Sequence, residues 1–180
     1  MGELVKINMS LEKNENEILA ERVVFRANSG LHFIDQCLSY IHRGGTDAAF
    51  SRSLYVLFSY NFELIIKACI LLASSQTKRE DLVKEIKTHN LEKLLNSLSE
   101  KTLGDIGIKS IRKTESSGFV EYIIEMTIGN NIVIQDFVDV RYDFGKDLLR
   151  DTDPNEANRM KSEVEIMLGM TKKIMKMLPL

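Results

Sequence analysis

The stretch LYVLFSYNFELIIKACILLA, residues 54–73, has about the length of a membrane-spanning helix. Its centre holds Asn61, Glu63 and Lys67, and each charged side chain at the centre of a span costs roughly 2.5 to 3.5 kcal/mol. These residues argue against insertion into a bilayer. We therefore expect a buried core helix, in a protein that has no membrane partner.

A second long helix is predicted ahead of this stretch. Residues 16–41 carry apolar side chains at a spacing of three to four, which describes one stripe of a long helix. Gly44 and Gly45 follow as its stop, and Thr46 then caps the core helix, which runs to about Ala73. Because the connection is short, the two helices are expected to pack antiparallel.

The clearest helix start lies near the end of the chain. In DPNE, Asp153 is the expected N-cap, Pro154 takes the first helical position and Glu156 follows three residues after the cap. The helix is predicted to run to about Met177, with an apolar face rich in methionine. Such a face suits the core of a bundle or, alternatively, the groove of a partner protein.

Two shorter helices are expected between the long ones. Thr77 and Glu80 have the spacing of a capping box and open the first of them. The second is THNLEKLLNSLSEK, residues 88–101. Together with the long helices they predict an up-down bundle.

The periodicity changes after residue 119. Apolar and polar residues alternate there, and GNN at 129–131 supplies residues that accept a positive φ, so we predict a β-hairpin at about 119–137. Residues 104–118, which contain three glycines, are expected to form an exposed loop, while a short third strand is the alternative for a part of that segment around Ile106, Ile108 and Ile111. The predicted fold class is mainly α: a bundle of four to five helices with one inserted hairpin, in a single domain 1–180 whose residues 1–14 are a candidate flexible segment.

Composition limits the function. The formal net charge is -2, so a nucleic acid would have to bind a local basic patch and not the whole surface. Cys37 and Cys69 lie in apolar helical patterns, where a reduced thiol acts as a small hydrophobe. The N-terminal residues lack the apolar core of a signal peptide, which predicts a cytoplasmic protein.

Motifs for cofactors and metals are missing. The chain has no glycine-rich phosphate loop, no CxxC, no HExxH and no GxSxG, and its histidines, His32, His42 and His89, are far apart in sequence. We expect no cofactor and no histidine-based metal centre.

Acidic residues offer one weaker alternative. Four aspartates between residues 136 and 147 are spaced three, four and four residues apart. On a continuous helix they would form a stripe of oxygen ligands for a divalent cation, although we expect a solvated face instead. The residues are Asp136, Asp139, Asp143 and Asp147.

Three segments in order, SYNFELIIKACILL, THNLEKLL and DFVDVRYDF, resemble the HEPN superfamily, helical domains of prokaryotic toxin and defence proteins named for nucleotide binding. The resemblance implies a homodimer that binds RNA or a nucleotide, with an antitoxin or a nucleotidyltransferase as partner. It implies a ligand site formed by Glu63, Lys67, His89, Arg141 and Tyr142.

Ribonucleases of that superfamily carry an arginine followed, after four to six residues, by a histidine. Here the matching positions after Arg141 hold Lys146, Asp147 and Leu148. Neither the lysine nor the aspartate titrates near neutral pH without a large shift. Arg26 and His32 in RANSGLH have the spacing, but on an uninterrupted helix they lie about 240° apart. Catalytic residues therefore stay open, with Arg141, Arg26 and His32 as candidates.

Each matched residue also has a structural interpretation. Glu63 and Lys67 have the spacing of a helical ion pair, His89 or its neighbour Asn90 fits a helix cap, and Arg141 fits an ion pair with Asp139 or Glu63. Two functions follow. The first is an RNA- or nucleotide-binding protein of a defence or toxin-antitoxin type, as an inactive or non-canonical ribonuclease, and the alternative is a non-catalytic helical interaction module.

Overall fold

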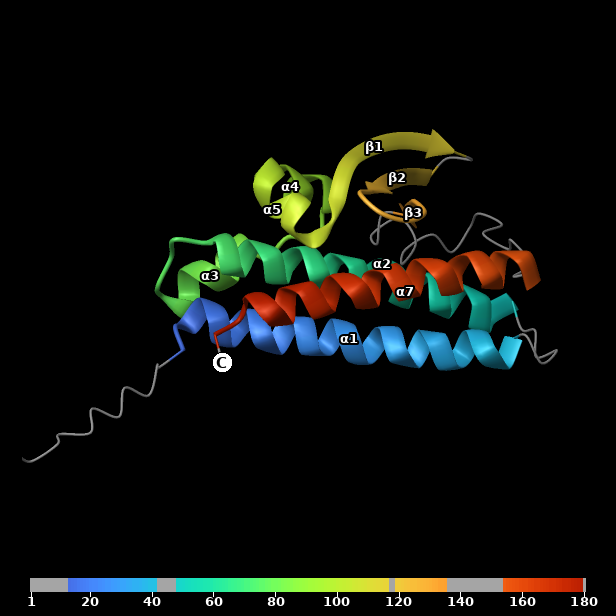
Figure 1. Ribbon diagram of the computed structural model, residues 1–180, viewed down its shortest axis with the longest axis horizontal. Helices are drawn as coiled ribbons and strands as arrows, with labels where there is room; N and C mark the ends of the chain where they lie inside the picture. Colours follow the sequence, from blue (N-terminus) through green and yellow to red (C-terminus); the bar gives the residue numbers. More distant parts are fainter. Residues whose placement is uncertain (1–12, 42–47, 117–118, 136–153, 180) are drawn as a thin grey trace, which may run out of the picture.

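The computed structural model describes residues 13–41, 48–116, 119–135 and 154–179. Three long helices lie side by side: α1 (Glu15–Ile41), α2 (Ala48–Ala73) and α7 (Pro154–Met177) (Figure 1). Helix α1 runs antiparallel to both α2 and α7. The mainly α bundle expected from the sequence is confirmed, and the predicted limits of its three long helices agree with the structure to within about two residues.

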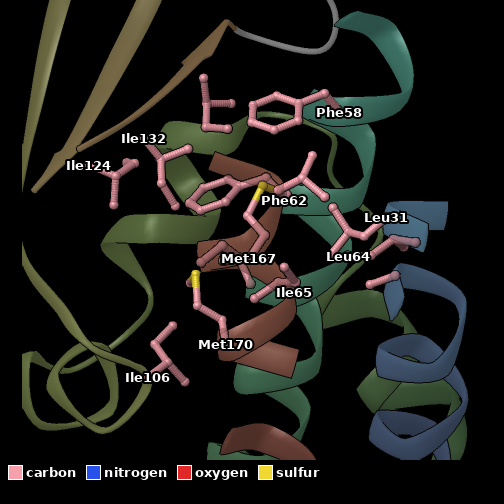
Figure 2. Close-up of a cluster of buried hydrophobic side chains, with 14 of the residues drawn as sticks. Leu31, Phe58, Phe62, Leu64, Ile65, Ile106, Ile124, Ile132, Met167 and Met170 are labelled. Carbon is pink, nitrogen blue, oxygen red and sulfur yellow. The ribbon is translucent and has the colours of Figure 1, made fainter. Parts of the chain in front are cut away.

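Helix α2 is the centre of the core. Every residue from 61 to 71 is buried, because α1, α7, α4 and the sheet pack around it. Figure 2 shows Phe62 of α2 pointing toward Ile132 and Ile124 of the sheet, while Leu64 lies toward Leu31 of α1. Full burial of such a side chain contributes roughly 1.5 to 3 kcal/mol.

The same helix contains the one membrane-span candidate among the described residues, Ser53–Ala73. Its apolar window is mostly buried inside the fold, as in the core helix of a soluble protein. The prediction of a core helix at 54–73 is thus confirmed.

Three short helices follow α2: α3 (Arg79–Glu85), α4 (Leu91–Asn96) and α5 (Glu100–Ile106). The prediction that Thr77 caps α3 is wrong, since Lys78 holds the N-cap position and makes no side-chain cap bond. The single helix predicted over 88–101 is also wrong. It is divided into α4 and α5 because Ser99 starts a new helix by accepting a hydrogen bond from the Thr102 N–H, 3.1 Å away.

An antiparallel sheet lies on one side of the bundle, in the order β1 (Ile108–Ser116), β2 (Phe119–Met126) and β3 (Ile132–Gln135) (Figure 1). The predicted hairpin is β2 and β3, and Gly129 between them has a φ of 103°, the positive value expected for GNN. The exposed loop predicted over 104–118 is wrong. Most of that segment is the alternative third strand, longer than expected, which pairs with β2 from Ile108 to Ser116.

The outer edge of β3 meets α7. Glu163, only 3% exposed, accepts a hydrogen bond from the Val133 N–H through its Oε1, over 3.2 Å. A strand edge otherwise presents unpaired backbone groups. The carboxylate of α7 therefore satisfies a donor of β3 and ties the sheet to the bundle.

Candidate functional site

Glu63 and Lys67 form an ion pair in the core. They stand one turn apart on α2, and Lys67 Nζ lies 2.6 Å from Glu63 Oε1. The side chain of Glu63 is 2% exposed and that of Lys67 is 8% exposed. Removing two charges from water costs several kcal/mol for each ion, so such a pair persists only with close contact and further hydrogen bonds. This is the helical pair that the spacing of four predicted.

His89 adds the third member. Its Nδ1 lies 2.9 Å from the same Glu63 Oε1, and half of its side chain is exposed. The next residue, Asn90, caps α4 by accepting a hydrogen bond from the Lys93 N–H, which fixes the backbone next to the imidazole. The cap expected at 89 or 90 is therefore Asn90, and His89 connects a buried carboxylate with the surface.

The contact of His89 with a carboxylate orients the imidazole ring. When Nδ1 carries the hydrogen and donates it to Glu63, Nε2 is the acceptor nitrogen of the ring. Such an arrangement presents an oriented imidazole to a molecule at the surface. It suits a hydrogen bond to a ligand or the transfer of a proton.

One atom of this site is unsatisfied. Glu63 Oε2 is buried and has no hydrogen-bond partner among the described residues. A buried acceptor without a donor costs about 1 to 3 kcal/mol. A donor brought to this oxygen would recover part of that free energy, so the orphan oxygen marks a position where a further polar group fits.

Two of the candidate catalytic residues are not brought together. Helix α1 is unbroken from Glu15 to Ile41, so Arg26 and His32 lie about 240° apart in the direction of the chain, which is about 120° by the shorter way, and about 9 Å apart along the axis. Both side chains are exposed.

Arg26 instead lines a cleft of about 400 Å³ between α1 and α2, which the sequence analysis did not predict. Asn61 of α2 lies directly against Gly30 of α1 at this cleft, and its Nδ2 donates to the Leu57 carbonyl over 2.7 Å. A glycine inside a helical pattern was the one available signal of such a close approach. The other lining residues are Phe25, Ser29, Leu57, Tyr60 and Leu64.

The remaining site predictions lie outside the described residues. They concern Arg141 and Tyr142, the acidic stripe of Asp136, Asp139, Asp143 and Asp147, and the N-cap Asp153. Within the described ranges, no group of three or more His, Cys, Asp or Glu side chains is placed to hold a metal ion.

The chain was compared with protein-family models, with curated proteins and with solved structures, and no match was found in any of the three.

Proposed function

We propose that this protein binds RNA or a nucleotide, as a HEPN-like protein of a prokaryotic defence or toxin-antitoxin type. It acts in the cytoplasm as a homodimer, with an antitoxin or a nucleotidyltransferase as its partner. The observation that carries the proposal is the contact of His89 and Lys67 with one oxygen of Glu63. The resemblance to the superfamily implies that these same three residues belong to the ligand site.

The chemistry of the three residues supports ligand binding. A buried ion pair contributes little net stability, since replacing both residues by apolar ones often leaves the free energy of unfolding unchanged or raises it. A pair with an orphan oxygen and a half-exposed imidazole is costly to keep for stability alone. A site that offers an oriented imidazole next to a lysine suits a ligand with anionic and hydrogen-bonding groups.

In this function the protein binds its ligand but does not cleave RNA by the superfamily's usual mechanism. Among the described residues, His89 is the one histidine in contact with the Glu63 and Lys67 pair, and the continuous helix α1 keeps Arg26 and His32 about 120° apart, at the two edges of its exposed face. General acid-base cleavage of RNA needs groups that titrate near neutral pH on both sides of the reacting phosphate.

Binding of a fluorescein-labelled RNA, followed by fluorescence anisotropy, tests the proposal. His89→Ala and Arg141→Ala are expected to weaken binding about tenfold, which corresponds to the loss of one charge-assisted hydrogen bond. Lys87→Ala is the control, because Lys87 is exposed and close to His89 in sequence. The proposal is wrong if the protein binds neither total RNA nor nucleotides, or if His89→Ala and Arg141→Ala both bind like the wild type.

The second candidate function is a helical interaction module without a ligand. It is favoured by the ion pair itself, because Glu63 and Lys67 neutralise each other inside the core and leave little net charge for a ligand. In that case the three residues hold α2 against the segment before α4. Light scattering and a pull-down with the neighbouring gene product would then reveal a protein partner while the RNA assay stays negative.

A further inference from the structure

The exposed face of α1 combines cations with aromatic rings. Taking 100° per residue, its exposed side chains from Arg22 to Tyr40 fall within an arc of about 120° and extend over about 27 Å, and the exposed Glu15 lies on the same arc near the start of the helix. We call this set the α1 stripe. It consists of Arg22, Phe25, Arg26, Ser29, His32, Phe33, Gln36 and Tyr40.

The α1 stripe is positively charged although the whole chain carries a net charge of -2. From Arg22 to Tyr40 it contains no acidic residue, and neither Arg22 nor Arg26 has an ion-pair partner among the described residues. Glu21 flanks the stripe, but its carboxylate is paired with Lys13 at 3.2 Å. The two guanidinium groups are therefore available to an anionic partner, and their planar forks match phosphate.

Its aromatic rings are unusually exposed. The side chains of Phe25 and Phe33 are 60% and 52% exposed, whereas Phe58 and Phe62 of α2 are buried in the core. Phe25 also forms a wall of the 400 Å³ cleft, together with Tyr60 and with the buried Asn61. That volume lies within the range of ligand pockets, and its aromatic walls suit a flat ring.

Phosphate-binding arginines that alternate with exposed aromatic rings are the components of a single-strand binding surface. Bases stack on the rings and the cations follow the backbone, without a need for a particular sequence. A duplex keeps its bases stacked inside and offers them to no such ring. The charge and the rings of the stripe thus favour a single strand over a duplex and over an apolar protein segment.

We propose that the α1 stripe binds single-stranded RNA, with Arg22 and Arg26 on phosphates and one base in the cleft beside Phe25 and Tyr60. This inference rests on the proposed function and extends it, because it adds a second RNA-contacting surface to the site formed by Glu63, Lys67 and His89. The local patch required by a chain of negative net charge is then on α1.

The test measures anisotropy of a labelled oligouridylate of about 12 nucleotides, and of the same strand in a duplex. Phe25→Ala and Arg26→Ala are expected to weaken single-strand binding by about tenfold each, as for the loss of one stacked base or one phosphate contact. Arg26→Ala should also reduce the slope of log K against log salt by about 1. Arg112→Ala and Ile128→Ala, exposed residues of the sheet and its hairpin loop, are the matched controls and should bind like the wild type.

Each other outcome overturns the inference in a different way. If the wild type binds RNA and both α1 variants bind equally well, the inference is wrong while the proposed function stands. If the wild type binds neither RNA nor nucleotides, the proposed function is wrong and the inference with it. If it binds nucleotides alone, only the inference is wrong. If Phe25→Ala instead changes the mass measured by light scattering and leaves RNA binding intact, the stripe is a contact between protein copies.

Discussion

Glu63 and His89 are 26 residues apart in the chain, and a distance of 2.9 Å joins their Oε1 and Nδ1 atoms. The contact brings α2 together with the segment just before α4. Glu63 is buried and His89 is half exposed, so this contact joins a polar group of the core to a polar group at the surface of the bundle.

The ion pair of Glu63 with Lys67 predicts strong coupling between the two residues. Lys67→Met leaves the Glu63 carboxylate buried without its cation, and we expect a loss of about 3 to 5 kcal/mol in the free energy of unfolding. Glu63→Leu is expected to be similarly costly, since it leaves the ammonium unpaired. Urea unfolding followed by circular dichroism measures these losses.

The double variant Glu63→Leu/Lys67→Met completes a double-mutant cycle with these single variants and is their control. An apolar pair removes both buried charges, so most of the stability should return. Additive losses in the double variant would contradict a buried pair. If the double variant is stable but has lost RNA binding, the pair is retained for the ligand and not for the fold.

The approach of α1 to α2 predicts that alanine is not tolerated at position 30. A Cβ atom on Gly30 would overlap the amide of Asn61. Although alanine is the better helix former by about 1 kcal/mol, we expect Gly30→Ala to lower the free energy of unfolding by about 1 to 3 kcal/mol through overpacking. Thermal unfolding of the variant gives the measurement.

Gly169 supplies the matched comparison. It also stands inside a long helix, but a Cβ atom there would meet nothing within 4 Å, so Gly169→Ala should raise stability by about 0.5 to 1 kcal/mol. Truncation of Asn61 to alanine should relieve the defect of Gly30→Ala in part. Equal effects at positions 30 and 169 would show that the close approach carries no energetic weight.

Much of this architecture follows from periodicity. The apolar stripes of the long helices, the cap signal of DPNE and the GNN turn all depend on local spacing, which can be read directly from the sequence. Strand β1 was expected to be largely loop because KTESSG is rich in residues typical of turns. Its pairing partner is β2, and that pairing overrides the weak local preference.

The parts of the candidate site could be predicted from the sequence to different degrees. A spacing of four residues predicted the pair of Glu63 and Lys67, but only the resemblance connected them with His89. The cleft between α1 and α2 depends on how Gly30 and Asn61 meet, which is a property of tertiary packing and leaves no periodic signal. The exposure of Phe25 was hidden for the same reason, since a helical pattern alone does not say which apolar residues stay outside the core.

The buried thiol on α2 makes a prediction about pH. Burial raises the pKa of Cys69 from 9.0 to about 12. The thiolate is the reactive form, so at about pH 8.5 iodoacetamide should label Cys69 far more slowly in the native protein than in guanidinium chloride. Peptide mass spectrometry gives the rate for each cysteine.

The direction of the pH effect on stability follows from the same shift. Because the pKa is higher in the folded than in the unfolded chain, the stabilisation is complete below pH 9.0 and is lost as the pH rises toward about 12. A Cys69→Ala variant, which lacks this ionisation, should lose less stability over that window. Labelling at equal rates in native and unfolded protein would contradict the buried position.

Glu163 predicts how the sheet depends on α7. In Glu163→Ala the Val133 N–H loses its acceptor, and we expect a loss of about 1 to 3 kcal/mol in the free energy of unfolding together with faster hydrogen exchange of the Val133 amide. Glu163→Gln keeps an acceptor oxygen and should lose less. Glu165→Ala, an exposed position on the same helix, is the control and should leave both quantities unchanged. If the exchange rate at Val133 is the same in all of the variants, the bond from α7 does not hold the edge of β3, and another contact must join the sheet to the bundle.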